Sequence, residues 1–385
     1  MKNNSFLPVS KNDMISRGWD EVDFVYVSGD AYVDHPSFGV SIITRVLENA
    51  GYKVGIISQP DWKKNDSFKI FGKPRLGFFV SSGNIDSMVA HYTVAKKKIS
   101  TDAYSPDSKM ALRPDRAVIV YCQKIREIYD DIPIVIGGLE ASLRRFAHYD
   151  YWDDKIKPSI LFESGADLIS FGMGEKQTIQ IANRLNNGED VKSLTDIKGT
   201  CYAVPVTETP YKGVECPSFE NVLNSKKEYA ISCRIQQDEQ DHIRGKVIKQ
   251  RHGKMMLVQN EPMEPLTTEE LDSVYALPYM RTYHPMYEKD GGVPGILEVE
   301  FSITHNRGCF GACNFCSIAF HQGRYVTCRS KESIIKEAEL LTELNGFKGY
   351  IHDIGGPTAN FRRTSCDVQL KKGLCKGKKC LAPNP

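Results

Sequence analysis

The fold of this chain is decided by the stretch from residue 23 to residue 58, which reads DFVYVSGDAYVDHPSFGVSIITRVLENAGYKVGIIS. Residues 23–29 have the pattern of a buried strand that ends in glycine, and residues 52–58 predict a second strand. Between them, apolar residues recur at helical spacing and stop before Gly51: Val40, Ile43, Val46 and Leu47. Strand, helix and strand in this order form a βαβ unit, so we expect parallel strands.

Three more strands are expected at residues 76–80, 132–136 and 168–171, with helices between them, one at residues 116–129. This order predicts an α/β fold with an open, doubly wound sheet, which binds ligands beyond the carboxyl ends of its strands. Glycines follow several of these strand ends, and they either form tight turns only or let a ligand approach the backbone. The glycines are Gly29, Gly83, Gly137, Gly138, Gly172 and Gly174.

Composition narrows the class of protein. The chain has 385 residues, of which 41% are hydrophobic and 25% charged, and its net charge is +2. We therefore expect a globular protein of more than one domain, with no sign of nucleic-acid binding. No apolar run reaches the roughly 18 residues of a membrane span, and the start lacks the apolar core of a signal peptide. Cytoplasmic location is the expectation, and no membrane partner is indicated.

The middle of the chain is less regular. Residues 246–259 predict a hairpin with Gly253 in its turn. Residues 197–206 predict an edge strand, and residues 219–239 predict a polar helix with Cys233 as a buried thiol. Prolines mark a linker that contains a helix capped by Thr267.

Seven of the 11 cysteines come after residue 300, which indicates metal or redox chemistry rather than disulfides. Cys309, Cys313 and Cys316 are separated by three and two residues. Three thiolates at this spacing can hold three irons of a cubane cluster and leave the fourth iron open to another ligand. They follow an alternating strand pattern at residues 297–304, and a helix at residues 331–345 comes next.

That helix is expected to begin after the N-cap Ser330 and to end at Gly346. A second strand at residues 349–354 then runs into Gly355-Gly356. The buried stripe of the helix is expected to consist of five apolar residues: Ile334, Ile335, Ala338, Leu341 and Leu344.

The motif Cys-x3-Cys-x2-Cys after a strand, with Phe315 before the third cysteine, resembles the radical S-adenosylmethionine (SAM) superfamily. Three blocks are more narrowly similar to the YgiQ-type, UPF0313-like radical SAM proteins: residues 307–316, 320–324 and 351–360. The resemblance implies a 4Fe–4S cluster on Cys309, Cys313 and Cys316, with SAM at the open iron. It also implies that the backbone at Phe315 meets the adenine of SAM and that Gly355 and Gly356 approach its methionine amino group.

The implied enzyme reductively cleaves SAM to a 5′-deoxyadenosyl radical that acts on an unidentified substrate. It needs a reductant such as flavodoxin or ferredoxin. The expected domains are a Rossmann-like domain at residues 1–206, a connecting region at residues 207–294 and the first part of a radical SAM βα barrel at residues 295–385. About six βα units make up such a barrel by resemblance. We therefore expect a truncated chain that turns over little by itself.

The first domain also resembles cobalamin-binding Rossmann-like domains, through residues 36–39, 136–142 and 166–175. Cobalamin is therefore a further expected cofactor. The chain departs from the Asp-x-His-x-x-Gly signature at Asp34-His35, which puts His35 in doubt as a cobalt ligand. Residues 144–154 are either a surface loop or a wall of the ligand crevice.

Two other classes of protein stay open from the residues alone. A zinc-stabilised binding module could take a fourth ligand from Cys328, His305 or His321. An iron–sulfur electron-transfer protein would need a fourth thiolate at cluster spacing. Cys366, Cys375 and Cys380 form a second group among lysines, either a basic thiol-bearing segment or a further metal site.

Overall fold

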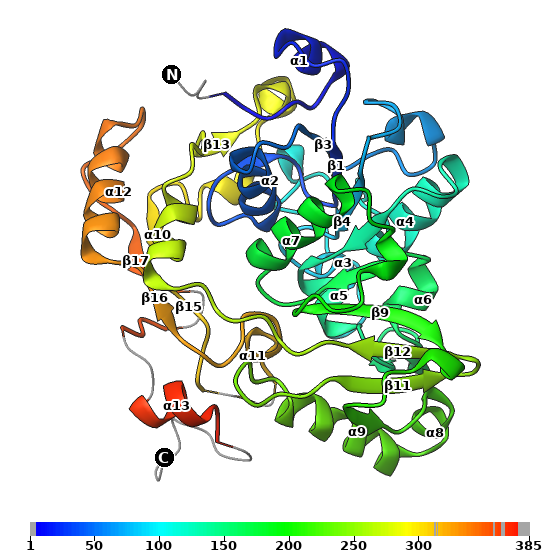
Figure 1. The fold of residues 1–385 in the computed structure, drawn as a ribbon. Helices are drawn as coiled ribbons and strands as arrows, with labels where there is room; N and C mark the ends of the chain where they lie inside the picture. Colours follow the sequence, from blue (N-terminus) through cyan, green and yellow to red (C-terminus); the bar gives the residue numbers. More distant parts are fainter. Residues whose placement is uncertain (1–4, 312, 314, 357–358, 363–365, 376–385) are drawn as a thin grey trace.

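The structure, a computed structural model, describes residues 5–311, 313, 315–356, 359–362 and 366–375. A nine-stranded sheet dominates the first two thirds of the chain (Figure 1). The predicted strands are confirmed as β1 (Phe24–Ser28), β3 (Val54–Ser58), β4 (Gly77–Ser81), β5 (Ile134–Ile136) and β8 (Leu168–Ser170). These five strands run parallel, and they lie in the order β3, β1, β4, β5, β8 across the sheet, an order found in doubly wound folds.

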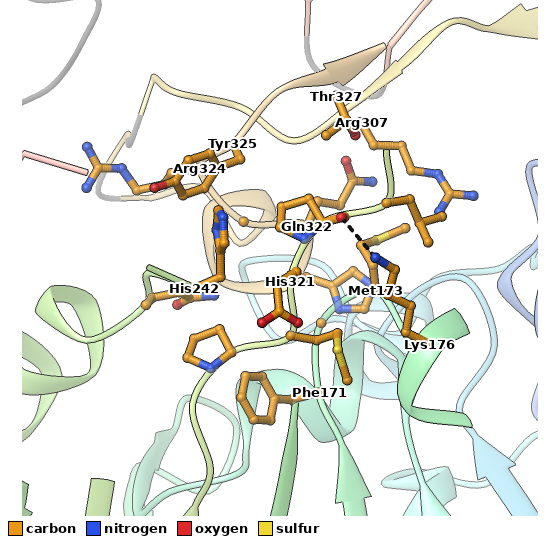
Figure 2. A pocket seen from close by; sticks show the side chains of 18 of the residues that line it. Phe171, Met173, Lys176, His242, Arg307, His321, Gln322, Arg324, Tyr325 and Thr327 are labelled. Atoms are coloured by element: carbon orange, nitrogen blue, oxygen red, sulfur yellow. Dashed lines mark hydrogen bonds between the residues drawn. The ribbon is translucent and has the colours of Figure 1, made fainter. Parts of the chain in front are cut away.

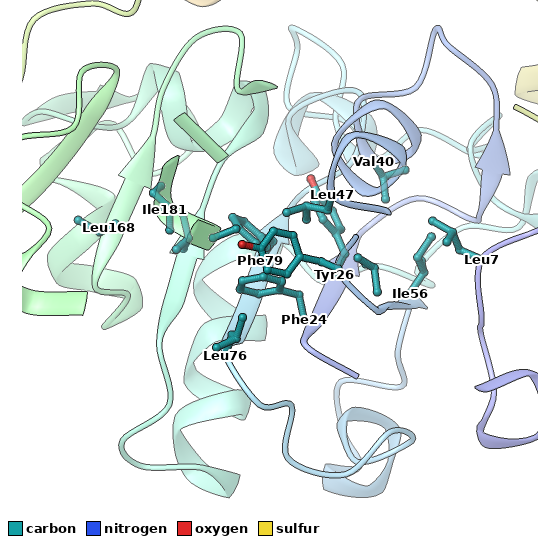
Figure 3. Packing of buried hydrophobic residues seen from close by; sticks show 14 of the residues in the cluster. Leu7, Phe24, Tyr26, Val40, Leu47, Ile56, Leu76, Phe79, Leu168 and Ile181 are labelled. Atoms are coloured by element: carbon teal, nitrogen blue, oxygen red, sulfur yellow. The ribbon is translucent and has the colours of Figure 1, made fainter. Parts of the chain in front are cut away.

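Helices cover both faces of this sheet because side chains alternate along each strand. Phe24 and Tyr26 belong to one core cluster, and Val25 and Val27 to the other. Figure 3 shows the first cluster, which includes Leu47 and Ile181 together with Phe24, Tyr26 and Phe79. The covering helices are α2 (Gly39–Asn49) and α7 (Glu175–Asn186) on this face, and α4 (Ala117–Ile128) and α6 (Ile160–Ser164) on the other.

The sheet continues beyond β8 through the region between the two expected domains. The expected edge strand is an interior one, β9 (Thr200–Pro205), because the hairpin of β11 (Ile248–His252) and β12 (Met255–Gln259) pairs with it. The hairpin itself is confirmed. β10 (Val214–Cys216) closes this end of the sheet. The domain boundary at residue 206 stays a prediction, although one sheet spans it.

Two helices pack beside this hairpin, α8 (Phe219–Asn224) and α9 (Lys226–Asp238). The expected single helix is thus broken, and Ser225 caps the second one. The prediction that Cys233 is buried is wrong, since it lies on the exposed side of α9. The remaining elements of the first part are α1 (Lys11–Ser16), β2 (Val33–Asp34), α3 (Ser87–His91), α5 (Gly138–Leu143), β6 (His148–Asp150) and β7 (Lys155–Lys157).

The last third contains the start of a βα barrel. β14 (Ser302–Thr304) and β17 (Asp353–Gly355) run parallel, and α12 (Lys331–Glu343) connects them, capped by Ser330 as predicted. The strand predicted at residues 297–304 is shorter than expected. The amides of Leu297 and Val299 bond to carbonyls three residues back, so a turn replaces its first half.

The other elements of this part bring distant segments together. α10 (Thr268–Tyr275) has the predicted capping box of Thr267 and Glu270. β13 (Thr282–Tyr283) pairs with β2 of the first domain. The rest are β15 (Asn306–Arg307), α11 (Ile318–His321), β16 (Thr327–Cys328) and α13 (Asp367–Lys372). No helix in the described part of the chain is long and apolar enough to cross a membrane.

Candidate cluster and SAM site

The three cysteines follow β15, which pairs with β16 at the carboxyl end of β14. The loop is anchored at its start: the Gly308 amide donates to Gln322 Oε1 at 3.1 Å, and the Cys309 amide donates to the Gly323 carbonyl at 3.1 Å. Gly308 has a φ of +83°, and a Cβ there would overlap the Tyr325 carbonyl. Only glycine therefore allows the chain to enter the cysteine loop on this path.

The cysteines themselves are free thiols near the surface. Cys309 and Cys316 are half-buried, and Cys313 is exposed. Within the described residues, no three His, Cys, Asp or Glu side chains are gathered so as to hold a metal ion. The donor chemistry suits an iron–sulfur cluster, since three thiols share one short loop, but the structure does not bring the sulfurs together.

The glycine turn lies beside this loop. Gly355 ends β17 opposite Thr304, and its carbonyl accepts the His305 amide at 2.8 Å. A Cβ on Gly356 would overlap the side chain of Asn306. Two strands that run parallel therefore deliver the cysteine loop and the glycine turn to the same end of the small sheet.

Asn306 is a residue that the sequence reasoning missed. It is fully buried, and both its Oδ1 and its Nδ2 are without a hydrogen-bond partner among the described residues. Unpaired buried amides are costly, so a ligand that pairs with them gains affinity. Asn306 therefore offers one donor and one acceptor between the cysteine loop and Gly356, which suits the amino and carboxylate groups of SAM. Its place between the expected strand at residues 297–304 and the first cysteine was the available signal.

Aromatic residues of the loop divide between surface and interior. Phe315 is 94% exposed, so its side chain packs against nothing in the described chain. Phe310 is buried instead, and its ring centroid lies 4.1 Å from that of Phe361. The sequence singled out Phe315 for its backbone, and that role stays a prediction.

Two side chains fasten the cysteine segment to the first domain. Arg307 forms a buried ion pair with Glu175 at the start of α7, and its guanidinium stacks on Tyr275. His321 Nδ1 lies 3.1 Å from Ser142 Oγ on α5. Burial lowers the pKa of His321 to about 4, so this imidazole is neutral at pH 7.

The first domain has a cavity at the carboxyl ends of β1, β4, β5 and β8, with about 670 Å³ of empty space, part of it open to solvent. The lining includes most of the predicted strand-end glycines: Gly83, Gly137, Gly138, Gly172 and Gly174. Gly29 does not line the cavity. A Cβ on Gly29 would instead overlap the Ser82 carbonyl. This glycine serves a close approach of two strands, whereas the others border a crevice.

His35 does not reach that crevice. It is fully buried, its Nδ1 accepts the Ser37 amide at 3.1 Å, and its Nε2 lies 3.4 Å from Arg281 Nη1. Any cobalamin in the crevice would thus be held without His35 as a ligand. Residues 144–154 line neither this cavity nor the one described below, and much of the segment is the surface hairpin β6–β7.

The second cysteine group is spread over the surface. Cys366 and Cys375 are exposed, and Cys366 precedes α13. Cys380 lies outside the described residues. Three residues were candidates for a fourth zinc ligand. Cys328 donates to the Phe361 carbonyl at 3.3 Å, and His321 contacts Ser142 as described above. His305 is buried, and its Nδ1 has no partner among the described residues.

Comparison with known proteins assigns the chain to a family. The chain belongs to the radical SAM N-terminal family, whose sequence model matches residues 6–302. It is 59% identical to a UPF0313 protein of Clostridium perfringens, over 100% of this chain and 58% of that protein. A UPF0313 protein of Clostridium botulinum (strain Loch Maree) is 57% identical, over 100% of this chain and 59% of its own length. The resemblance to UPF0313-like proteins is thereby confirmed, and the chain spans about 58% of the length of such relatives.

Among solved structures, the chain is similar to the radical SAM methyltransferase TsrM from Kitasatospora setae. With cobalamin and a 4Fe–4S cluster bound, that structure has a TM-score of 0.43 and 17% identity, over 83% of this chain and 45% of that one. With tryptophan and a SAM analogue bound, the TM-score is 0.44 and the identity 16%.

Proposed function

We propose that this chain carries the cluster- and SAM-binding part of a radical SAM enzyme that reductively cleaves SAM to a 5′-deoxyadenosyl radical. The observation that carries the proposal is the shared end of β14 and β17, where the cysteine loop and Gly355-Gly356 emerge side by side. The substrate is unidentified, and a flavodoxin or ferredoxin would be the reductant.

In this proposal Cys309, Cys313 and Cys316 hold a 4Fe–4S cluster. A reduced cluster held there would supply the one electron that cleaves the sulfonium of SAM into methionine and the 5′-deoxyadenosyl radical. Gly355 and Gly356 approach the methionine amino group of SAM, and Asn306 provides a donor and an acceptor to the same end of the molecule. The backbone at Phe315 meets the adenine. Cobalamin in the glycine-lined crevice is a further proposed cofactor.

The work of the surrounding residues is to hold this loop in place. The amides of Gly308 and Cys309 are tied to Gln322 and Gly323, and the ion pair of Arg307 with Glu175 fixes the preceding strand. The site thus depends on contacts with the first domain as well as on the cysteines.

Anaerobic reconstitution with iron and sulfide tests the proposal. We expect equal amounts of iron and sulfide, up to about four of each per chain, and an electron paramagnetic resonance signal of the reduced cluster that SAM changes. Cys309→Ala, Cys313→Ala and Cys316→Ala should each abolish that signal. Cys233→Ala, which removes an exposed thiol on α9, is the matched control and should keep it.

The same preparation separates the other two classes of protein. One zinc per chain and no iron would identify a zinc-stabilised module and contradict the proposal. A reversible cluster that needs a fourth cysteine, and whose signal SAM leaves unchanged, would identify an electron carrier. These readouts report binding, so they do not require turnover by the 385-residue chain.

A further inference from the structure

A second cavity lies between the first domain and the cysteine segment, with about 750 Å³ of empty space, part of it open to solvent (Figure 2). Phe171 and Met173 line it on the side of the sheet, and residues 322–325 line it on the opposite side. Because Gln322 and Gly323 also accept hydrogen bonds from Gly308 and Cys309, the cavity wall is directly attached to the cysteine loop. A molecule in this cavity would lie next to the candidate cluster site.

Four lysine, arginine and glutamate residues line the cavity: Arg324 has an interaction partner, and the other three form ion pairs. Lys176 pairs with Glu270 at 2.7 Å, Arg307 pairs with Glu175, and Glu264 pairs with Lys198. None of these pairs therefore leaves a large excess of charge for a ligand.

Arg145 differs from them. It lies beneath the cavity floor, 2% exposed, with its guanidinium carbon 4.9 Å from the centre of the Phe171 ring. Its Nε donates to Gln259 Oε1 at 2.6 Å and its Nη1 to the Ser142 carbonyl, while Nη2 is buried without a partner among the described residues. No carboxylate of the described residues neutralises it, and burial lowers the pKa of this guanidinium.

A buried charge without a counter-charge is rare in proteins because no ion pair offsets the free energy lost when the charge leaves water. Arg145 is also linked to the cavity wall through Ser142. The Ser142 carbonyl accepts a hydrogen bond from Arg145, and the Ser142 hydroxyl contacts His321, which lines the cavity. The uncompensated positive charge thus lies one aromatic ring away from a cavity of mixed apolar and polar lining.

We propose that this cavity binds an organic anion with an apolar body, and that Arg145 balances the negative charge through the Phe171 layer. Naming this anion as the substrate rests on the proposed function. Binding itself does not, since it requires neither the cluster nor SAM.

Fluorescence titration of the cluster-free chain with anilinonaphthalene sulfonate, an apolar anion, tests the proposal. N-phenylnaphthylamine serves as the uncharged probe of similar shape. We expect one saturable site for the anion in the wild type. Arg145→Met should weaken anion binding by roughly tenfold and leave binding of the neutral probe unchanged. Arg145→Lys, which keeps the charge, should bind the anion within about threefold of the wild type.

Thermal unfolding without a probe shows whether Arg145→Met still folds. The variant removes an unpaired buried charge, which favours stability, but it also removes the donors to Gln259 Oε1 and the Ser142 carbonyl, which costs stability. The two effects oppose each other, so we expect its unfolding temperature to stay close to that of the wild type. Arg251→Met changes an exposed arginine on β11 and should leave the anion affinity unchanged.

Equal anion affinity in the wild type and in folded Arg145→Met would overturn the proposal. Should that variant fail to fold, the wild-type protein still tests the proposal: the anion must raise its unfolding temperature more than the neutral probe does, and equal shifts would overturn the proposal. Displacement of the bound anion by SAM would also overturn it, because the cavity would then belong to the SAM site. These outcomes do not depend on cluster assembly, because the titrations use the cluster-free chain. The proposal can therefore be tested even if the proposed function fails.

Discussion

At the scale of single residues, Gly308 is the position that controls entry into the cysteine loop. Its φ of +83° is one that side chains other than glycine rarely adopt, and its missing Cβ leaves room for the Tyr325 carbonyl. Gly346, at the end of α12, has a similar φ of +89°, but a Cβ there would meet no described atom of another segment within 4 Å. Substitutions at the two glycines therefore distinguish two costs: backbone strain alone at Gly346, and backbone strain plus steric overlap at Gly308.

Gly308→Ala should lower the free energy of unfolding by at least about 3 kcal/mol, because strain and overlap with a backbone oxygen add. Gly346→Ala should cost about 1 kcal/mol, from strain alone. Chemical denaturation measures both. Equal losses in the two variants would show that the Tyr325 carbonyl moves aside easily.

At the scale of elements, α12 buries a narrower stripe than its sequence predicts. Leu341 is fully buried against Phe301 and Ile303, whereas Ile335 is 56% exposed. The physical reason is that α12 packs on a sheet of only two described strands, β14 and β17, which covers one side of the helix. Periodicity gives the direction of an apolar face, and the width of its partner decides how much of that face is buried.

Leu341→Ala should therefore destabilise this unit by about 2–4 kcal/mol, through lost burial and the cavity left behind. Ile335→Ala, on the same helix, should change the stability by less than about 0.5 kcal/mol. Amide hydrogen exchange in β14 and β17 is the appropriate measurement, since the unit can open without the large sheet. Similar protection in both variants would contradict the packing described here.

At the scale of the whole molecule, the two parts of the chain are joined by buried polar contacts. The side chains of Arg307 and Glu175 are 6% and 5% exposed, and they come from the strand before the cysteines and from the first turn of α7. His321 and Ser142 add a second contact between α11 and α5. A change in the first domain can therefore reach the cysteine loop through few side chains.

Arg307→Met should lower the unfolding free energy by about 3–5 kcal/mol, because it leaves the Glu175 carboxylate buried and alone. Replacing both residues by Met should recover most of that loss, since no unpaired charge remains. Lys198→Met breaks an exposed ion pair and should cost less than about 1 kcal/mol. A double variant no more stable than Arg307→Met would show that the ion pair is not what couples the two parts.

Much of the fold followed from local patterns. The βαβ stretch at residues 23–58, the later parallel strands, the hairpin around Gly253 and the caps Thr267 and Ser330 were all predictable, because each depends on neighbours in the sequence. The turn at residues 297–301 and the surface position of Cys233 were not. Both depend on which distant segment covers the element, and no periodicity records that.

The sequence by itself determined the class of protein, because cysteine spacing and glycine turns are local features with a direct chemical meaning. Only the tertiary structure decided which side chains lie around them. It placed Asn306 beside Gly356, excluded His35 from the strand-end crevice and left Arg145 buried without a carboxylate. The physical reason is that hydrogen-bond partners and counter-charges come from segments distant in the chain, so their presence or absence is settled only when the sheet and the barrel segment pack together.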